Sequence, residues 1–240
     1  MPRADGRAPD DLRPVKVTRG FTASTPGSVL YESGRTKVLV TVSVEERVPP
    51  WMQGKGKGWL TAEYSMLPGS TPDRKARAST SNRVDGRTYE IQRLVGRSLR
   101  SVLDDQALGE RTLWVDCDVL EADGGTRTAA INGAYLAVVD ALKKHRFTRP
   151  LPRWPLKDAI GAVSVGIVGA TPVLDLDYQE DHLAAVDMNV VMTSSGKFIE
   201  VQGTGEGRPF EGDELAALLA LAQGGIEKIL ARAKQVLAGP

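Results

Sequence analysis

Asp123-Gly124-Gly125-Thr126-Arg127-Thr128 separates two segments whose apolar residues follow different periods. In the preceding segment, RTLWVDCDVLE (111–121), apolar residues occupy every second position from Leu113 to Val119, as in a β-strand. In the following segment, AAINGAYLAVVDALKK (129–144), they recur at helical spacing and alanine is frequent. The 123–128 turn therefore lies where a strand leads into a helix.

This turn has the residue types of an anion-binding site. The first N–H groups of a helix carry partial positive charge and lack intrahelical acceptors. Gly124 and Gly125 would let an anion approach the backbone closely. Thr126 adds a hydroxyl donor, and Arg127 adds a planar, permanently charged donor suited to phosphate. The P-loop is excluded because no Gly-Lys-Ser/Thr follows the glycines, whereas an ordinary turn with a solvated arginine fits the same spacing equally well.

The composition is that of a globular protein. The chain has 240 residues, of which 41% are hydrophobic and 25% charged, enough for a substantial core. No segment resembles a linker, so we expect a single domain over residues 1–240. Cys117 is the only cysteine, which rules out an internal disulfide framework. The chain shows neither a secretory segment nor an apolar run of membrane-spanning length, and we expect a soluble, cytoplasmic protein with no membrane partner.

Basic residues are concentrated in one part of the chain. Residues 55–100 contain ten Lys or Arg and four Asp or Glu, a net charge of +6, so the remainder carries −5. Within this part, the polar stretch 68–82 predicts a loop that carries Arg74 and Arg77. Such a basic segment indicates a surface for a polyanion, although any one of its arginines could simply be solvated. Aromatic residues that could stack bases or pack in the core are Trp51, Trp59, Tyr64 and, further upstream, Phe21.

The order of the predicted elements favours an α+β fold with helices packed on a mixed β-sheet. Alternating apolar residues predict strands at 28–32, 36–45, 61–67, 111–121, 162–168, 172–177, 186–193 and 197–202. Helical spacing predicts helices at 88–103, 129–144 and 213–237, with Asp213 as the N-cap of the last and a weak point at its Gly224-Gly225. The segment 3–13 is polar and is expected to be irregular.

Two aspartates are candidates for binding a divalent cation. Asp187 begins a strand that is otherwise apolar, so its carboxylate needs a partner, and Asp181 is six residues away. Two neighbouring carboxylates commonly hold Mg²⁺, which bridges to substrate phosphates. Alternatively, Asp181 caps a turn and Asp187 accepts hydrogen bonds from backbone N–H groups. Arg87 begins one long helix as Arg127 begins the next, and the two could meet at one anion.

Other catalytic chemistries find little support in the sequence. The Gly-x-Ser-x-Gly motif of serine hydrolases is absent. His145 and His182 lack metal-ligand spacing and are expected to be ordinary surface residues. Cys117 lies on a predicted core strand and is expected to be inert.

Long sequence words, spread over nearly the whole chain, closely resemble those of the ribonuclease PH family. Its members are phosphate-dependent 3′→5′ exoribonucleases related to polynucleotide phosphorylase and to the subunits of the exosome ring. The matching words are DGR (5–7), LRP (12–14), SVEERVPP (43–50), GKGWLTAEYSMLP (56–68), GRTYEIQRLVGRSLR (86–100), LGERTLWVDCDVLEADGGTRT (108–128), VDMNVVMT (186–193) and EVQGTGE (200–206).

The resemblance implies a fold like domain 2 of ribosomal protein S5, assembled as a homohexameric ring of three dimers. It also implies the roles of several residues. Phosphate, the co-substrate, would bind to Arg87, Gly125, Thr126 and Arg127. Asp181 and Asp187 would hold Mg²⁺ or Mn²⁺ and, with Arg127, would be catalytic. Arg74, Arg77, Arg93 and Arg97 would contact RNA.

The implied reaction is the reversible trimming of tRNA precursors beyond the 3′ CCA end, with release of nucleoside diphosphates. Processing of rRNA belongs to the same expected class of functions. One alternative is a non-catalytic ring subunit that only binds RNA, but the acidic pair and both phosphate arginines are present. Another is a small-molecule kinase with the same fold, which would need a Gly/Ser-rich ATP loop. The only candidate for such a loop, residues 203–207, is short.

Overall fold

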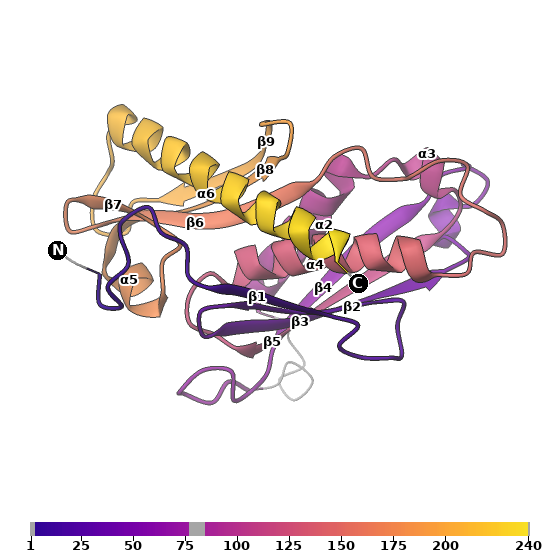
Figure 1. Cartoon of the computed structure of the whole chain (residues 1–240), viewed down its shortest axis with the longest axis horizontal. Helices are drawn as coiled ribbons and strands as arrows, with labels where there is room; N and C mark the ends of the chain where they lie inside the picture. The colour runs from indigo at the N-terminus through magenta and orange to yellow at the C-terminus, as the bar shows by residue number, and fades with distance from the viewer. Residues whose placement is uncertain (1–2, 77–84, 240) are drawn as a thin grey trace.

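The computed structural model describes residues 3–76 and 85–239, which form two β-sheets with helices packed on them (Figure 1). The first sheet has the strand order β1-β2-β3-β5-β4. Its β4 runs parallel to β5 and the other pairs are antiparallel, so the sheet is mixed. Its strands are β1 (Val15–Arg19), β2 (Gly27–Ser33), β3 (Thr36–Glu45), β4 (Trp59–Met66) and β5 (Thr112–Glu121).

The second sheet is antiparallel and has the order β7-β6-β8-β9. Its strands are β6 (Ile160–Val168), β7 (Thr171–Leu174), β8 (Ala184–Thr193) and β9 (Phe198–Thr204). The long helix α6 (Gly212–Ala238) packs on β6, β7 and β8 (Figure 1). Gly225 makes this approach possible, because a Cβ there would lie 2.6 Å from Leu174 Cδ1. The expected weak point in the helix is therefore a packing contact, and the helix continues through it.

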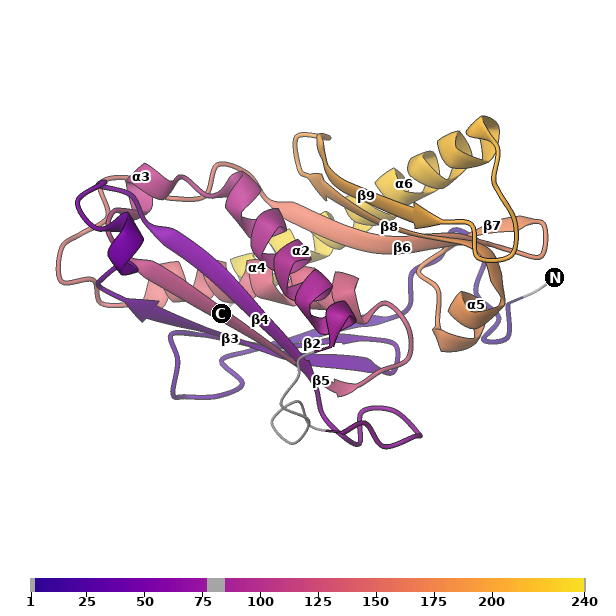
Figure 2. The ribbon, with the colours of Figure 1, turned by 180° about the vertical axis from the view of Figure 1, so that it is seen from behind.

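Two helices cover the first sheet, and one of them joins the two halves of the molecule. α2 (Gly86–Val102) packs on β4 through its apolar stripe (Figure 2). α4 (Thr126–Lys144) contacts β2 and β3 on one side and β6 on the other, and its residues 128–142 are buried throughout. Shorter helices are η1 (Pro50–Met52), α3 (Asp105–Leu108) and α5 (Tyr178–Leu183).

The predicted α+β class, with helices on a mixed sheet, is confirmed. The helix after the 123–128 turn begins three residues earlier than its apolar period predicts, directly after Gly125. The N-cap of α6 is Glu211 rather than Asp213. The sequence did not predict β1, α3 or α5, and the expectation of one domain over 1–240 stays a prediction. In the described part of the chain, no helix is both long and apolar enough to cross a lipid bilayer.

Candidate active site

The 123–128 turn is held tightly against the segment that precedes α5. Gly124 and Gly125 have φ angles of 76° and 62°, a conformation that favours glycine. A Cβ on Gly124 would lie 2.6 Å from the backbone of Leu176 and Asp177, so only glycine fits there. Gly125 is the N-cap of α4 without a side-chain cap, which leaves the first N–H groups of a long helix without a capping acceptor.

Four of the predicted site residues line one cavity of about 540 Å³. Arg87 and Arg127 come from the first turns of α2 and α4. Asp181 comes from α5 and Asp187 from β8. The structure therefore brings together two pairs of opposite charge from four separate elements. The remaining lining residues are Glu90, His182, Asn189, Gln202, Thr204 and Glu206.

The two arginines of the cavity differ in how they are held. Arg127 Nη1 donates a hydrogen bond to Gln202 Oε1 (2.8 Å) and lies 3.6 Å from Glu90 Oε1. Gln202 Nε2 in turn donates to Glu90 Oε1 at 2.6 Å, so the Arg127 side chain, only 14% exposed, is fixed by a short network. Arg87 is exposed and, within residues 3–76 and 85–239, forms no hydrogen bond or ion pair. Its guanidinium is therefore free to bind an anion.

Thr126 is buried and Gly125 is half-buried, whereas Arg87 is exposed. The Thr126 side chain is buried, and its Oγ1 accepts a hydrogen bond from the hydroxyl of Tyr64 at 2.9 Å. The buried Tyr64 is therefore a support for the turn and is not available to stack a base. Neither Gly125 nor Thr126 lines the cavity, whereas Arg127, the next residue in the first turn of α4, does.

Both carboxyls of the acidic pair have pKa values above the ordinary value. Desolvation in the recess raises the pKa of Asp187, and the charges of Asp181 and Glu206 raise it further against the opposing effect of Arg127. Desolvation also raises the pKa of Asp181, although its side chain opens to solvent at the rim, and Arg87 and Arg127 oppose the shift. The pair is therefore incompletely neutralised by its protein neighbours.

The residues of the pair fit a hard divalent cation. Asp187 Oδ1 is buried and has no hydrogen-bond partner in the described part of the chain, which is costly for a carboxylate oxygen. Residues 3–76 and 85–239 contain no group of three or more His, Cys, Asp or Glu side chains that could bind a metal alone. Mg²⁺ commonly takes one or two carboxylates and completes its coordination with water and substrate phosphates, so two aspartates are enough.

An ion-pair cluster from the N-terminal segment holds the two sides of the site, and the sequence did not predict it. This N-terminal cluster consists of Arg3, Arg7, Arg13, Asp175 and Glu180. Arg13 binds Asp175 through Nη2 (2.6 Å) and Nε (3.1 Å), and its Nη1 donates to the carbonyl of Asp123 at 2.5 Å. Arg3 binds both carboxylate oxygens of Glu180 at 2.7 Å. The segment 3–13 thus fastens both the 123–128 turn and α5, beside which it runs in Figure 1.

Of the predicted RNA-binding residues, Arg74, Arg93 and Arg97 do not line the cavity. Arg93 and Arg97 are exposed on α2, and Arg97 Nε lies 3.4 Å from Glu200 Oε2. Arg74 is exposed in the loop after β4, whereas Arg77 lies outside the described residues.

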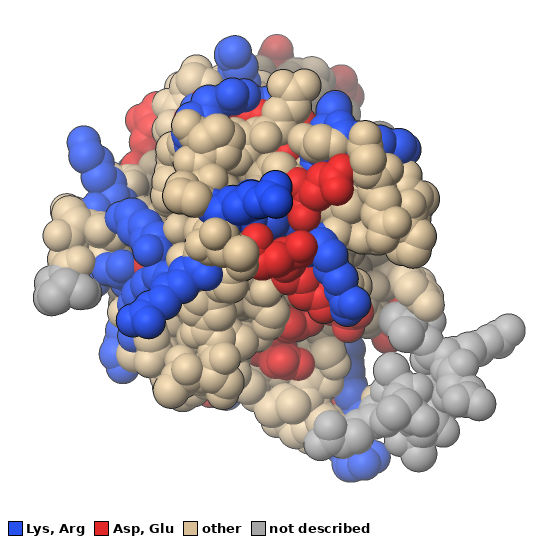
Figure 3. Space-filling view, turned by 90° about the vertical axis from the view of Figure 1, so that its right-hand side faces the viewer, with Lys and Arg blue, Asp and Glu red and all other residues tan. Residues whose placement is uncertain are grey.

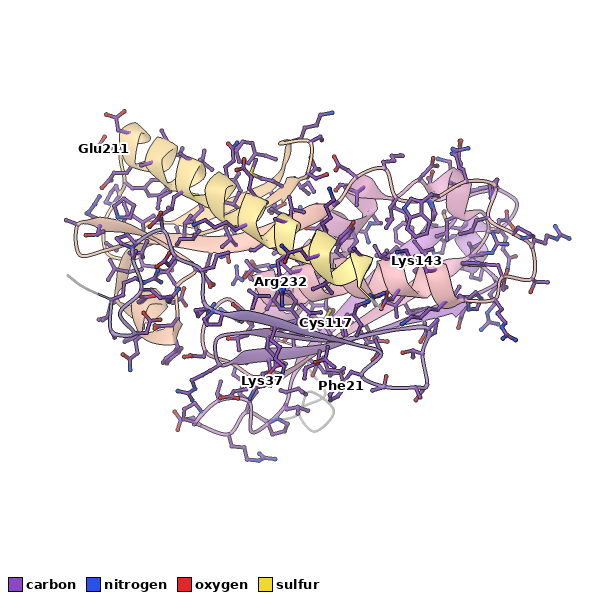
Figure 4. The ribbon with its side chains drawn as sticks, viewed as in Figure 1. Phe21, Lys37, Cys117, Lys143, Glu211 and Arg232 are labelled. Carbon is purple, nitrogen blue, oxygen red and sulfur yellow. The ribbon has the colours of Figure 1, made fainter. Side chains whose placement is uncertain are left out.

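Two further expectations concern single residues. Cys117 is buried in β5, and burial raises the pKa of its thiol, so it has no access to a reactive thiolate state (Figure 4). His182 was expected to be an ordinary surface residue. It is exposed but lines the cavity, with its ring stacked on Tyr178 at 6.4 Å between centroids.

Comparison with known families identifies the chain. The model of the 3′ exoribonuclease family, domain 1, matches residues 11–144, more than half of the chain. The chain belongs to the 3′ exoribonuclease family. The model of domain 2 of this family matches residues 158–225. Arg87 and Arg127 come from the first matched segment and Asp181 and Asp187 from the second, so the cavity lies between the two.

Solved structures share this fold over nearly the whole chain. Rice (Oryza sativa) Rrp46 is 20% identical with a TM-score of 0.80, over 98% of this chain and 100% of that one. A chain of the Archaeoglobus fulgidus exosome, solved with RNA bound to the active site, is 21% identical with a TM-score of 0.80, over 96% and 92%. A chain of an archaeal exosome core is 21% identical with a TM-score of 0.74, over 97% and 91%. At these identities the likeness establishes the fold alone.

Proposed function

We propose that the chain is a phosphorolytic 3′→5′ exoribonuclease that trims tRNA precursors beyond the CCA end and releases nucleoside diphosphates. The observation that carries this proposal is the meeting of Arg87, Arg127, Asp181 and Asp187 in one cavity beside the start of α4. Two guanidinium groups and a helix N-terminus suit a phosphate anion. An incompletely neutralised carboxylate pair beside them suits a cation that bridges to a second phosphate.

Inorganic phosphate would be the nucleophile of the reaction. Arg87 and Arg127 would hold it, with the N–H groups at Gly125 and Thr126 completing the set of donors. One of its oxygens would attack the phosphorus of the terminal phosphodiester in line with the bond to the 3′ oxygen of the preceding nucleotide. That bond breaks, a nucleoside diphosphate leaves, and the shortened strand keeps the 3′ hydroxyl after it takes up a proton. Because one phosphate ester replaces another, the reaction should also run in reverse.

Asp181 and Asp187 would hold Mg²⁺ or Mn²⁺ in this site. The bound metal would offset negative charge on the scissile phosphate and the leaving oxygen. The raised pKa values of both carboxyls and the unpartnered Oδ1 of Asp187 support this assignment. The protein itself would contribute mainly the position of the reactants and the charge around them.

The RNA strand would approach along basic residues outside the cavity. Arg74, Arg93 and Arg97 are exposed, and we include Arg77 from the family resemblance. One structurally similar exosome has been solved with RNA at its active site. A homohexameric ring of three dimers follows from the resemblance and would give several such sites around one assembly.

The test is the trimming of a tRNA precursor with a short 3′ trailer, with and without orthophosphate. We expect shortening only with orthophosphate, and nucleoside diphosphates as products. Shortening in phosphate-free buffer with release of monophosphates would overturn the proposal in favour of hydrolysis. RNA that binds without being shortened under either condition would identify a non-catalytic ring subunit.

A further inference from the structure

An aromatic pair with one exposed and one half-buried ring lies at the far end of the first sheet from the candidate site. Trp51, in η1, is 56% exposed and meets Trp59, the first residue of β4, edge to face at 4.9 Å between centroids. Lys55 Nζ lies 6.0 Å from the ring centroid of Trp51, and the Arg100 guanidinium lies 5.0 Å from that of Trp59. A large exposed indole with cations at this range is suited to a ligand that has both a flat ring and a negative charge.

A stripe of side chains on α2 connects this pair with the cavity. Glu90, Arg93, Arg97 and Arg100 follow one another at intervals of three, four and three residues, which places them on one face of the helix. Glu90 lines the cavity, whereas Arg100 Nη1 donates to the carbonyl of Leu60 at 3.0 Å, beside Trp59. Figure 2 shows α2 lying across β4, with its C-terminal end near the start of that strand. The stripe spans about 15 Å at the helical rise of about 1.5 Å per residue.

The loop that carries Lys55 is held in place rather than loose. Gly56 N donates to Glu110 Oε1 at 3.0 Å, and Lys57 Nζ lies 3.1 Å from Asp105 Oδ2. These carboxylates are engaged with the loop, while Lys55 forms no ion pair within the described part of the chain. Figure 3 looks at this end of the molecule, where basic side chains surround a band of acidic ones. The loop that carries Lys55 is therefore positioned before a ligand arrives, which lowers the entropic cost of binding.

We propose that Trp51, supported by Trp59 and flanked by Lys55 and Arg100, is a stacking platform for single-stranded RNA. It takes a base several nucleotides upstream of the 3′ end, while the intervening phosphates follow Arg93 and Arg97. This inference rests on the proposed function for the direction of the strand. It adds to that function a second contact, which makes affinity depend on the length of the RNA.

The experiment measures RNA binding without orthophosphate, so that binding is separated from turnover. A fluorescent single-stranded RNA of about 12 nucleotides can reach the platform, whereas one of about 4, the lower end of single-strand site sizes, fills the cavity first. We expect Trp51→Ala to raise the Kd of the longer RNA about 5- to 10-fold and to leave the shorter one unchanged, since one stacked base is lost. Trp51→Phe should restore most of the affinity.

The matched control is Phe21→Ala, which removes an aromatic side chain of similar exposure, 47%, from the loop between β1 and β2 (Figure 4). It should leave the affinity for both RNAs unchanged. Equal affinity of Trp51→Ala and the unmodified protein for the longer RNA would overturn the proposal. So would a change in oligomeric state on sedimentation with RNA affinity intact, which would make Trp51 a subunit contact. If the unmodified protein binds RNA but releases no diphosphate when orthophosphate is added, the proposed function fails. The affinities of Trp51→Ala and the unmodified protein for the longer RNA still test whether Trp51 is a stacking platform.

Discussion

Two groups of arginines and carboxylates, the N-terminal cluster and the candidate site, each include a residue of α5. The two groups differ in how completely their charges are paired. In the N-terminal cluster, Arg13 and Asp175 have side chains that are only 4% and 7% exposed and are fully paired. In the candidate site, Arg87 has no partner in the described part of the chain, and Asp187 has a buried oxygen without a donor. The boundary between the two groups falls between neighbours in the sequence, Glu180 and Asp181.

This contrast separates charges that stabilise the fold from charges that can bind a ligand. Burial alone would raise the pKa of Asp175, but the hydrogen bonds and charge of Arg13 outweigh it and hold the pKa below the ordinary value. For Asp187, desolvation and like charges dominate, and the pKa is raised. The same residue type therefore contributes to stability in one group and carries an unfavourable charge in the other, which a bound cation would relieve.

The largest effect is expected for Asp175→Asn in the N-terminal cluster. The substitution leaves the Arg13 charge buried without a counter-charge, which should lower the free energy of unfolding by about 3–5 kcal/mol. Asn is chosen because position 175 has a φ of 54°, which Asn tolerates. Urea unfolding measures the change.

The pH dependence of that effect follows from the sign of the pKa shift. Because the pKa of Asp175 is lowered in the folded state, its contribution is present above the ordinary pKa of about 3.9 and is lost as the pH falls through the folded value. The control is Asp5→Asn, which removes the partly exposed partner of Arg7 and should change stability little. Equal unfolding midpoints for Asp175→Asn and Asp5→Asn would contradict the assigned difference between buried and exposed pairs.

The next effect is on catalysis. Arg127→Ala should lower the rate of phosphate-dependent trimming by about 10²–10³-fold, because a preorganised charged donor to phosphate is lost. Its state of assembly should not change, since the partners of Arg127 in residues 3–76 and 85–239, Gln202 and Glu90, are polar side chains that line the same cavity. Release of nucleoside diphosphates measures the rate, and sedimentation checks the assembly. Normal diphosphate release by this variant would refute the role assigned to Arg127.

Unlike Asp175→Asn, Asp187→Asn should impair activity without lowering stability. The pKa of Asp187 is raised in the folded state, so its ionisation costs more in the folded protein than in the unfolded chain. The free energy of unfolding therefore falls as the pH rises above the ordinary pKa of about 3.9, and below that pH there is no such penalty. At neutral pH the variant should therefore unfold at the same or a higher urea concentration, a gain of no more than about 1 kcal/mol. Its trimming activity should no longer respond to a Mg²⁺ titration. A clear loss of stability, or an unchanged response to Mg²⁺, would place Asp187 with the structural charges.

The sequence predicted the candidate site better than it predicted the cluster that supports it. The strand and helix around the 123–128 turn have strong local periods, so their junction could be found without any tertiary information. Helix α5 is only six residues long and has no apolar stripe, and it was missed. Its capping box, in which Asp177 and Glu180 exchange hydrogen bonds, was the available signal.

The tertiary contacts of the cluster could not be derived from local pattern. Arg13 and Asp175 are 162 residues apart in the chain, and nothing in either neighbourhood specifies the other. Segment 3–13 therefore looked like a polar, irregular stretch, although Arg3 and Arg13 are buried. Residues 5–7 and 12–14 did match sequence words of the ribonuclease PH family. The resemblance therefore singled out this segment, but it did not predict which residues its arginines bind.

The smallest effect should come from a charge that belongs to neither group. Arg93→Gln on α2 should weaken binding of single-stranded RNA a few-fold and lower the slope of log Kd against log salt by about 0.7, the value for one phosphate contact on a single strand. The effect should be the same for every sequence, because a phosphate contact carries no base information. Arg35→Gln is the control, since Arg35 is also exposed but lies in the turn between β2 and β3 and pairs with Glu121 of β5. An unchanged salt slope for Arg93→Gln would mean that RNA leaves the cavity by another path, and a matching fall for Arg35→Gln would mean that the strand responds to net charge rather than to the α2 stripe.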